Sequence, residues 1–315
     1  MDLRQLAALI AVSETGTFSA AASRLHTVQS NVSAHIARLE RILGATLVDR
    51  SAGRLTEEGE IVVARARRVQ AELDAMVADV ISLRHEVIGE VRIGVIGTVA
   101  RWLVAPLHSR LRQLHPGVHM VVVDASTTSL IPQLLTGNLN LAIANLPVSD
   151  DDVTSRPLFD EDMLAIVPEA HPLAGRRSLY LDDLADLPLL LPPRGRSYRT
   201  AIDAAAASVG VVLSPKAEID GVTLITALAL GGLGIGIVPS TGAPMAMEGW
   251  RRIPVEGLPR RRVGIVQRRR GMLSAPSRAL LQALYEILPG EISHLSGVEL
   301  LPPPGDADVV APIPE

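Results

Sequence analysis

Apolar residues in the first sixty positions recur at helical spacing, with two short interruptions. The pattern predicts a helix that Asp2 caps and Gly16 ends. A second helix follows over 20–25, with Ser19 as its N-cap and Phe18 as the preceding hydrophobic staple. After a break at 26–27, a third helix is expected over 28–43, because its apolar residues form one inward stripe: Val32, Ile36, Leu39 and Leu43.

The outward face of this third predicted helix is polar. It carries mostly short hydrogen-bonding side chains near the helix N-terminus: Gln29, Ser30, Asn31, Ser33, His35 and Arg38. Gln and Asn can pair with adenine in the major groove, and a helix N-terminus attracts phosphate. We therefore predict that the helix reads double-stranded DNA, with Ser19 and Thr27 contributing from the preceding segments. A solvated helix face is the alternative interpretation.

The next segment favours the DNA-reading hypothesis. Residues 47–50 and 54–56 flank a short turn that ends at Gly53, which predicts a hairpin wing. Arg50 and Arg54 on such a wing can reach phosphates or the minor groove. Residues 1–60 carry six Arg (4, 24, 38, 41, 50, 54) against seven acids (2, 14, 40, 49, 57, 58, 60), a net charge of −1. Each copy thus neutralises few phosphates, and strong binding requires several copies.

A long helix is expected from a Thr56 N-cap to Gly89. Its apolar residues are spaced alternately four and three apart, as in a heptad seam: Val62, Ala66, Val69, Leu73, Met76, Val80, Leu83 and Val87. A narrow seam of this length favours pairing with a second copy of the chain, and packing on its own domain is the alternative. Two-fold pairing would present two reading helices to a pseudo-palindromic site.

Beyond residue 90 the pattern changes to short apolar strands that alternate with helices. Strands are predicted over 91–96, 118–124, 139–145, 164–168, 189–192, 235–238 and 263–267, with helices over 100–114, 130–135, 198–209, 223–230 and 277–288. This alternation predicts two α/β lobes built on mostly parallel sheets. Small ligands bind between such lobes, beyond the carboxyl ends of the strands.

Polar residues at those strand ends are the candidate ligand-binding side chains. They are Thr98, Arg101, Ser126, Thr127, Asn145, Arg194, Ser197, Arg199 and Thr223. Hydroxyl groups and arginines suit a small anionic metabolite. The alternative is that Ser126 and Thr223 only cap helices and that the arginines are solvated.

Composition excludes several classes of function. The chain has 315 residues, a formal charge of −4 and no cysteine, so disulfide scaffolds, thiol nucleophiles and cysteine-based metal sites are excluded. We find no hydrolase or metalloprotease motif, and we predict no metal and no cofactor. The start of the chain lacks the pattern of a secretion signal. Residues 221–247 carry no charge, but glycines and prolines divide them into pieces too short to span a bilayer. A soluble cytoplasmic protein without membrane contact is expected.

Three further features are discounted as sites. The glycine-rich segment 231–236 follows a predicted helix and is interpreted as a helix-to-strand turn. The arginine runs 260–262 and 268–270 are interpreted mainly as solvated surface. The proline-rich tail 301–315 is expected to be disordered.

Taken together, residues 2–292 resemble the LysR-type transcriptional regulators. The likeness is strongest over 6–59, in Gly16 to Ala22 (Gly-Thr-Phe-Ser-Ala-Ala-Ala), Gln29, Val32-Ser33, Leu39-Glu40 and Leu55-Thr-Glu-x-Gly59. Segments 134–143 and 231–239 look like the effector-domain signatures. Val28, Ser30 and Ala34 depart from the residues that the family often has on its reading helix.

The resemblance implies a winged helix-turn-helix domain (1–58), a dimerising linker helix (59–88) and a two-lobed effector domain of the type 2 periplasmic-binding-protein kind (89–300). Lobe I is placed at 91–162 plus 264–292, and lobe II at 163–263. The implied protein is a homodimer or homotetramer that bends promoter DNA, responds to a metabolite and contacts RNA polymerase. Gln29, Ser33, His35 and Arg50 match DNA-contacting positions, and Thr98, Thr127 and Thr223 fall near effector-contacting ones. Without cysteine, the peroxide-sensing branch is excluded. The competing hypothesis is an enzymatic or small-molecule-binding α/β domain with an N-terminal oligomerisation module.

Overall fold

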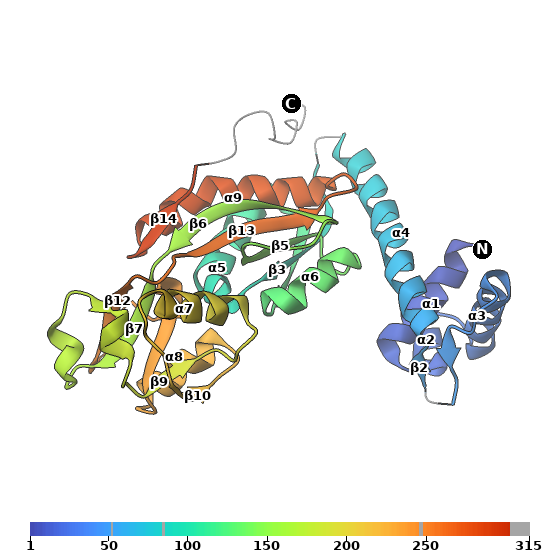
Figure 1. The fold of residues 1–315 in the computed structure, drawn as a ribbon. Helices are drawn as coiled ribbons and strands as arrows, with labels where there is room; N and C mark the ends of the chain where they lie inside the picture. Colours follow the sequence, from blue (N-terminus) through green and yellow to red (C-terminus); the bar gives the residue numbers. More distant parts are fainter. Residues whose placement is uncertain (52, 84–85, 246–247, 303–315) are drawn as a thin grey trace.

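The computed structural model describes residues 1–51, 53–83, 86–245 and 248–302. Its N-terminal domain contains helices α1 (Leu3–Thr15), α2 (Phe18–Arg24) and α3 (Gln29–Leu43), and a hairpin of β1 (Val48–Asp49) and β2 (Arg54–Leu55). Helix α4 (Glu57–Ser82) joins this domain to the rest of the chain, from which the domain stands apart (Figure 1). The polar face of α3 is therefore not covered by the larger C-terminal part.

Local signals set most of the helix ends in this domain. The carboxylate of Asp2 accepts a hydrogen bond from the backbone N–H of Gln5 at 3.0 Å, and the Gln5 side chain accepts one from Asp2 N–H at 3.1 Å. Gly16 ends α1 in the left-handed region, with φ of 74°. Both predictions for α1 are confirmed.

The predicted start of the second helix is wrong. Helix α2 begins at Phe18 with Thr17 as its N-cap, because the Thr17 hydroxyl accepts a hydrogen bond from Ala20 N–H at 3.2 Å. Ser19 is thus inside the first turn, and Phe18 is the first helical residue rather than a staple. The helix begins two residues earlier than the hydrophobic pattern alone indicated.

The wing packs against the start of α4. Strands β1 and β2 pair antiparallel, with Val48 opposite Leu55, as the sequence predicts. Thr56 caps α4 by accepting a hydrogen bond from Gly59 N–H at 3.0 Å. A Cβ atom at Gly59 would lie 2.0 Å from the carbonyl oxygen of Leu47, so only glycine lets the helix approach the wing this closely.

Helix α4 is shorter than its heptad pattern predicts. It ends at Ser82, and Gly89 begins a strand instead of ending the helix. Val87, the last seam position, is 7% exposed and packs in the core of the first lobe. Burial in that core removes Val87 from the seam.

The first lobe is a sheet of strands in the order β14-β6-β13-β5-β3-β4. Its strands are β3 (Gly89–Val95), β4 (Val118–Asp124), β5 (Leu141–Asn145), β6 (Val153–Glu161), β13 (Arg261–Arg268) and β14 (Val298–Leu300). Its helices are α5 (Gly97–Leu114), α6 (Thr127–Leu135) and α9 (Ala275–Ser293). Helices α5 and α9 pack against each other, and α6 packs against β5 (Figure 1).

The second lobe is a sheet in the order β10-β9-β11-β7-β12-β8. Its strands are β7 (Met163–Pro168), β8 (Leu179–Tyr180), β9 (Leu189–Leu191), β10 (Pro215–Glu218), β11 (Ile235–Pro239) and β12 (Trp250–Glu256). Its helices are α7 (Ser197–Ser208) and α8 (Val222–Leu230), with short 3-10 turns η1 (Pro172–Gly175), η2 (Leu181–Leu184) and η3 (Ser240–Gly242). The uncharged stretch folds as α8 and β11, and the glycine-rich segment is the turn between them, as predicted.

The sheets are mixed rather than mostly parallel. Strand β13 returns to the first lobe antiparallel to both β5 and β6, and β7 runs antiparallel to both β11 and β12. The first lobe resumes at Arg261, three residues before the predicted boundary, and includes β14. Strand β6 was not predicted, because a proline such as Pro157 argues against a strand in the sequence. The strand runs through Pro157, and its pairing register with β13 shifts opposite this proline, between Val263 and Gly264.

Residues 303–315, which hold most of the predicted disordered tail, lie outside the described residues. In the part of the chain that the structure describes, no single helix is long and apolar enough to cross a membrane; only α1 and α2 taken together, across a bend of 117°, reach that length and composition.

Candidate nucleic-acid interface and inter-lobe site

The polar face of α3 is open to solvent. Gln29, Ser30, Asn31 and Arg38 are exposed, while Ser33 and His35 are partly exposed. On the opposite face, Val32, Ile36 and Leu39 are each 0% exposed in the domain core, but Leu43, the last residue of the predicted inward stripe, is 42% exposed at the helix end. The helix thus has its core face and its candidate reading face on opposite sides, as the spacing predicts.

Side chains of the preceding segments meet the N-terminus of α3. The hydroxyl of Ser19 donates a hydrogen bond to the side-chain oxygen of Gln29 at 3.2 Å. The amide of Asn31 donates to the hydroxyl of Thr27 at 3.0 Å. These exposed bonds orient the two amide side chains and are weak enough to exchange for contacts with bases.

The wing is held against the same helix. Arg50 donates to the hydroxyl of Ser33 at 3.2 Å, and its guanidinium lies 5.4 Å from the centre of the Phe18 ring. Glu40 of α3 accepts a hydrogen bond from the backbone N–H of Leu47 at 2.8 Å, which fixes the start of the wing. Arg54 is exposed on β2. The structure therefore brings α3, the turn before it and the wing together on one exposed surface.

In the first lobe, four predicted residues lie at the amino ends of α5 and α6 or at the end of β5. Thr98 is 4% exposed at the start of α5. Ser126 precedes α6, and its hydroxyl lies 2.9 Å from that of Thr128. Thr127 accepts a hydrogen bond from the backbone N–H of Asn145 at 3.0 Å. The side-chain oxygen of Asn145 is buried and has no hydrogen-bond partner among the described residues.

In the second lobe, Arg194 and Thr223 are exposed, at the segment before α7 and in the first turn of α8. Ser197 opens α7, but its side chain lies outside the described part of the chain. Arg199 contradicts its predicted role as an anion-binding residue. It is 1% exposed and binds Asp203 at 2.8 Å and Glu218 at 2.9 Å. Burial alone would lower the pKa of Arg199, but these two carboxylates outweigh burial and raise the pKa above its ordinary value. Arg199 therefore stays charged, and its charge is already balanced by Asp203 and Glu218.

A buried ion pair of the first lobe, at its junction with the second lobe, was not predicted. Arg261 is 8% and Glu161 0% exposed at the side chain, and the guanidinium Nε donates to Glu161 at 2.8 Å. Arg261 also donates to the hydroxyl of Thr98 at 2.8 Å, while Glu161 accepts from the backbone N–H of Thr241 at 2.8 Å. This network joins α5 to η3 of the second lobe, and we call it the inter-lobe network.

The interpretation of 260–262 as solvated surface is therefore wrong at its central residue. Arg260 and Arg262 are exposed, as predicted, and they bind Asp162 and Asp160; the hydrogen bonds that Arg262 donates to Asp160 raise the pKa of Arg262. Arg268 of the second run is also half-buried, and it donates to the carbonyls of Leu134 and Leu139 at 3.1 Å. The sequence of three consecutive arginines does not indicate which of their side chains is buried.

Two further arginines connect the lobes. Arg101, a predicted residue, donates to the carbonyl of Thr241 at 2.7 Å. Arg196, which the sequence analysis missed, ion-pairs with Asp220 and donates to the hydroxyl of Thr128 at 2.9 Å. Arg196 precedes α7 and Thr128 lies in α6, so this bond crosses from the second lobe to the first beside Ser126 and Thr127.

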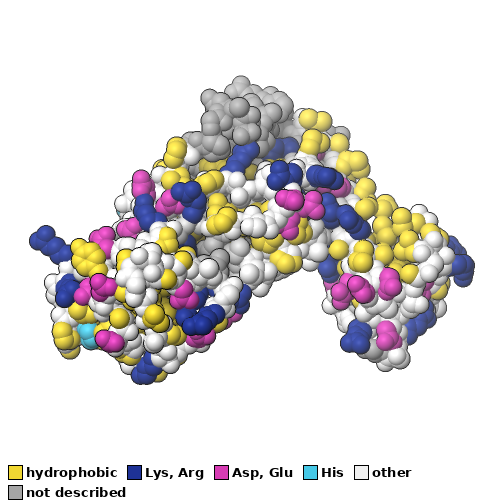
Figure 2. Space-filling view, in the orientation of Figure 1, with side chains coloured by type: hydrophobic (Ala, Val, Ile, Leu, Met, Phe, Trp, Pro, Cys, Tyr) yellow, Lys and Arg dark blue, Asp and Glu magenta, His cyan; other side chains and the backbone are white. Residues whose placement is uncertain are grey.

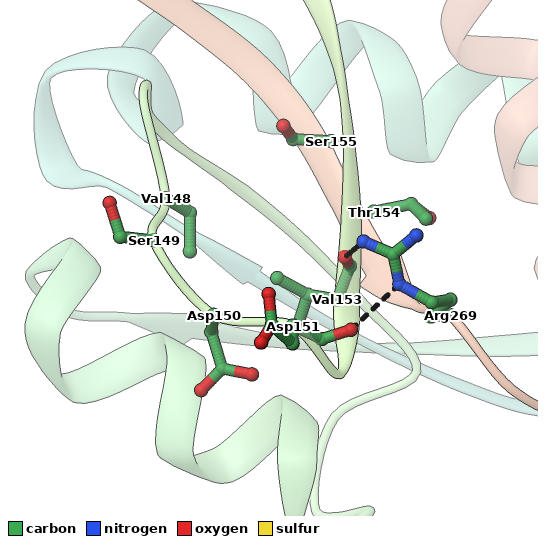
Figure 3. Close-up of a pocket in the computed structure, with 8 residues that line it drawn as sticks. All are labelled: Val148, Ser149, Asp150, Asp151, Val153, Thr154, Ser155 and Arg269. Carbon is green, nitrogen blue, oxygen red and sulfur yellow. Dashed lines mark hydrogen bonds between the residues drawn. The ribbon is translucent and has the colours of Figure 1, made fainter.

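A surface hollow of the first lobe holds none of the predicted residues. It lies beside the loop between β5 and β6, where Arg269 donates to the carbonyls of Asp151 at 2.7 Å and Val153 at 3.2 Å (Figure 3). The Asp150 carboxylate accepts from the backbone N–H of Asp152 at 2.9 Å. These hydrogen bonds fix the conformation of the loop. They give Arg269 and Asp150 a structural role that requires no bound ligand.

Two family models match the chain. Residues 3–60 match the bacterial regulatory helix-turn-helix protein, lysR family, and residues 84–288 match the LysR substrate binding domain. The matches cover the open helical face and both lobes.

Named relatives extend over nearly the whole chain. A probable hydrogen peroxide-inducible genes activator of Mycobacterium leprae is 32% identical over 91% of this chain and 94% of its own. The DNA-binding transcriptional dual regulator OxyR of Escherichia coli is 28% identical over 94% and 98%. The solved structure of a full-length OxyR variant from Pseudomonas aeruginosa superimposes with a TM-score of 0.70, at 26% identity over 94% and 96%.

Proposed function

Because the chain belongs to the LysR family of bacterial helix-turn-helix regulators, we propose that it binds promoter DNA through α3 and its wing, under control of a small molecule held between its lobes. The chain is a transcriptional regulator and not an enzyme, so the competing enzymatic hypothesis is not supported. The observation that carries the proposal is the exposed polar face of α3, braced by Ser19, Thr27 and Arg50.

Each reading residue has a role that its chemistry supports. Gln29 and Asn31 present amides that pair with adenine, and Ser33 and His35 reach bases or phosphate. Ser19, Ser30 and Thr27 lie at the helix N-terminus, where hydroxyls and backbone N–H groups bind phosphate. Arg38, Arg50 and Arg54 supply positive charge to the DNA backbone.

Two copies of the chain would be paired through α4. Its seam residues Val69, Met76, Val80 and Leu83 are 42%, 57%, 58% and 74% exposed. Hydrophobic side chains gather over α4 in the space-filling view (Figure 2). A single chain leaves this stripe in water, so we propose a homodimer, or a homotetramer built from such pairs, with one reading helix per half-site.

The effector site is proposed between Thr98, Ser126, Thr127 and Asn145 of the first lobe and Arg194, Ser197 and Thr223 of the second, with Arg101 at its edge. The unpartnered oxygen of Asn145 and the lobe-crossing Arg196 support it, because a ligand can bind one and displace the other. The name of a relative refers to genes induced by hydrogen peroxide. This chain has no cysteine, so a thiol cannot sense peroxide in it. A metabolite effector, a cytoplasmic location and contact with RNA polymerase belong to the same proposal.

A mobility-shift assay with the DNA upstream of the protein's own gene tests DNA reading. A Gln29→Ala/His35→Ala double variant should bind at least about tenfold more weakly, since a good base contact contributes about 1–3 kcal/mol. A matched Gln282→Ala/His108→Ala double variant, exposed in the first lobe, should bind like the unaltered protein. Equal loss in both variants, or no shifted band for the unaltered protein at low salt, contradicts the proposal.

Peroxide provides a second test, directed at the control mechanism. Hydrogen peroxide added before the DNA should leave the shifted band and its mobility unchanged, because no thiol is present to oxidise. A peroxide-dependent change in the band would show that another residue senses the oxidant.

A further inference from the structure

A second cavity lies at the junction of the lobes, apart from the proposed effector site. It measures about 300 Å³ and lies between α5, the segment from η3 to β12 and the chain before β14. Arg101 is the only proposed effector-site residue that lines it; Thr98, Thr127, Asn145 and Thr223 do not. The cavity therefore has to be explained by its own residues.

Two hydrogen-bond donors at this cavity have no partner among the residues that the structure describes. The indole Nε1 of Trp102 and the Nε of Arg252 are both buried, and both side chains line the cavity. Buried donors are costly to leave unpaired, and in folded proteins they nearly always have a partner. Two such donors beside one cavity are compatible with a bound group that carries acceptor oxygens, and the charge of the cavity lining distinguishes which group fits.

The charge at the cavity is also unbalanced. In the described residues, neither Arg252 nor Arg101 forms an ion pair, whereas the buried Arg261 and Arg199 each bind a carboxylate. The Arg252 Nη2 donates to the carbonyl and hydroxyl of Ser240 at 3.0 and 2.9 Å, which are neutral partners. Burial lowers the pKa of Arg252, and no neighbouring carboxylate opposes that effect. An anion would provide the missing negative charge.

The rest of the lining is largely apolar. Leu295, Val298 and Ala243 lie on it together with the ring of Trp102, which packs edge-on against Phe159 with ring centres 5.8 Å apart. A volume near 300 Å³ is at the small end of ligand pockets. Shape and chemistry thus favour a compact molecule with one charged group and an apolar body.

We propose that this cavity binds a small monocarboxylate with an apolar body, whose carboxylate lies against Arg252, Arg101 and Trp102. Arg101 and Trp102 come from the first lobe, and Arg252 comes from the second. A ligand that contacts both sides stabilises the present arrangement of the lobes, so this second site would change the response to the effector. The proposal does not depend on the identity of the effector.

Tryptophan fluorescence of the full chain tests the site directly. The chain contains two tryptophans, so Trp250→Phe leaves Trp102 as the reporter. Cyclohexanecarboxylate is the probe, titrated to about 10 mM, because a Kd of about 1 mM is the weakest binding expected of a specific site. We expect a saturable change, and none from the neutral cyclohexanemethanol.

Charge variants decide which arginine carries the binding. In the Trp250→Phe background, Arg252→Gln should raise the Kd at least about tenfold, and Arg252→Lys should restore part of the affinity. Arg251→Gln is the matched control, since Arg251 is the adjacent, exposed arginine and pairs with Glu169. If Arg252→Gln does not fold, Arg252→Lys alone replaces it, with an expected severalfold loss.

Three results would overturn the proposal. They are no saturable change with the carboxylate, equal binding of the alcohol, and an affinity that Arg252→Gln leaves unaltered. The last result would place the probe elsewhere, such as in the proposed effector site at Thr98, Thr127 and Thr223. Loss of DNA binding by any of these variants does not bear on the proposal, because the readout is fluorescence of the free protein.

Discussion

The reading face and the inter-lobe network differ in how far apart their partners lie in the chain. On the reading face, Asn31 bonds a residue four positions away and Ser19 one ten positions away. At the lobe junction, Arg261 bonds Thr98 of the same lobe across 163 positions, and Arg101 bonds Thr241 of the second lobe across 140. The first set forms wherever α2 and α3 fold. The second set requires the complete first lobe and, for the bond from Arg101 to Thr241, the second lobe as well.

The two regions also differ in burial, which changes what each contact is worth. The bonds on the reading face are exposed, so water replaces them at little cost and DNA can do the same. The Arg261–Glu161 pair is enclosed, and removing one partner leaves a buried charge. The reading face is therefore built to exchange partners, and the network is built to keep the lobes in register.

The largest predicted effect comes from breaking the network. Glu161→Gln should lower the free energy of unfolding by about 3–5 kcal/mol, because Arg261 then stays buried without a counter-charge. Thermal or urea unfolding of the full chain measures this loss. Glu169→Gln, which removes an exposed carboxylate paired with Arg251, should cost less than about 1 kcal/mol. Equal losses would show that burial does not separate the two regions.

The same contrast explains what the sequence could predict. Helices α1 and α3, the wing and the open polar face follow from spacing, caps and glycines within a few residues of each other. The errors in this domain are local too, since two hydroxyls compete to cap α2 and Thr17 prevails over Ser19.

The inter-lobe site was only partly predictable. Strand ends and helix starts indicated Thr98, Thr127, Asn145 and Thr223. For Arg199, Asp203 four positions later is a local sign of an ion pair that the sequence analysis missed, whereas nothing near Arg199 in the sequence indicates Glu218. Likewise, no local pattern pairs Arg261 with Glu161, one hundred positions away. Partners at that separation are set by strand order, and the mixed sheets were themselves not predicted.

The second-largest effect should come from the α4 seam, an exposed surface that would become buried only in a dimer. Met76→Glu/Val80→Glu should raise the dimer dissociation constant at least about a hundredfold, because it places unpaired charges in an apolar interface. Analytical ultracentrifugation measures it. Val209→Glu/Val212→Glu, equally exposed on the second lobe, is the control, and dissociation by that variant instead would move the interface away from α4.

A smaller effect is expected from the wing. Arg50→Gln should weaken DNA binding severalfold for all sequences alike and reduce the salt dependence of log K by about one, which corresponds to one lost phosphate contact. Its bond to Ser33 is exposed, so stability should hardly change. Arg112→Gln, an exposed arginine on α5, is the control. A marked drop in melting temperature for Arg50→Gln would show that the reading face carries structural energy as the network does.

The smallest effect on stability is expected from a partly buried histidine of the first lobe. It tests whether burial of a charge, rather than its location in the lobes, makes a contact important for stability. His115 ends α5 in the first lobe, and burial lowers its pKa while Glu286 partly opposes this. As the pH falls through about 6.5, the unfolded chain takes up the proton first, so stability decreases until the folded imidazole is also charged. The lowered pKa of Glu286, bound by Arg110 and Gln282, acts only below about 4.5.

Urea unfolding at pH 7.5 and 5.5 therefore isolates the histidine. His115→Asn should lose slightly less stability on acidification than the unaltered chain, because it lacks the imidazole whose pKa burial lowers. The effect should be far smaller than that of Glu161→Gln, because His115 is only partly buried and lies outside the inter-lobe network. Suppose that the stability change due to His115 is as large as the loss in Glu161→Gln. Then location in the lobe, rather than burial of the charge, would determine how much a contact contributes to the free energy of unfolding.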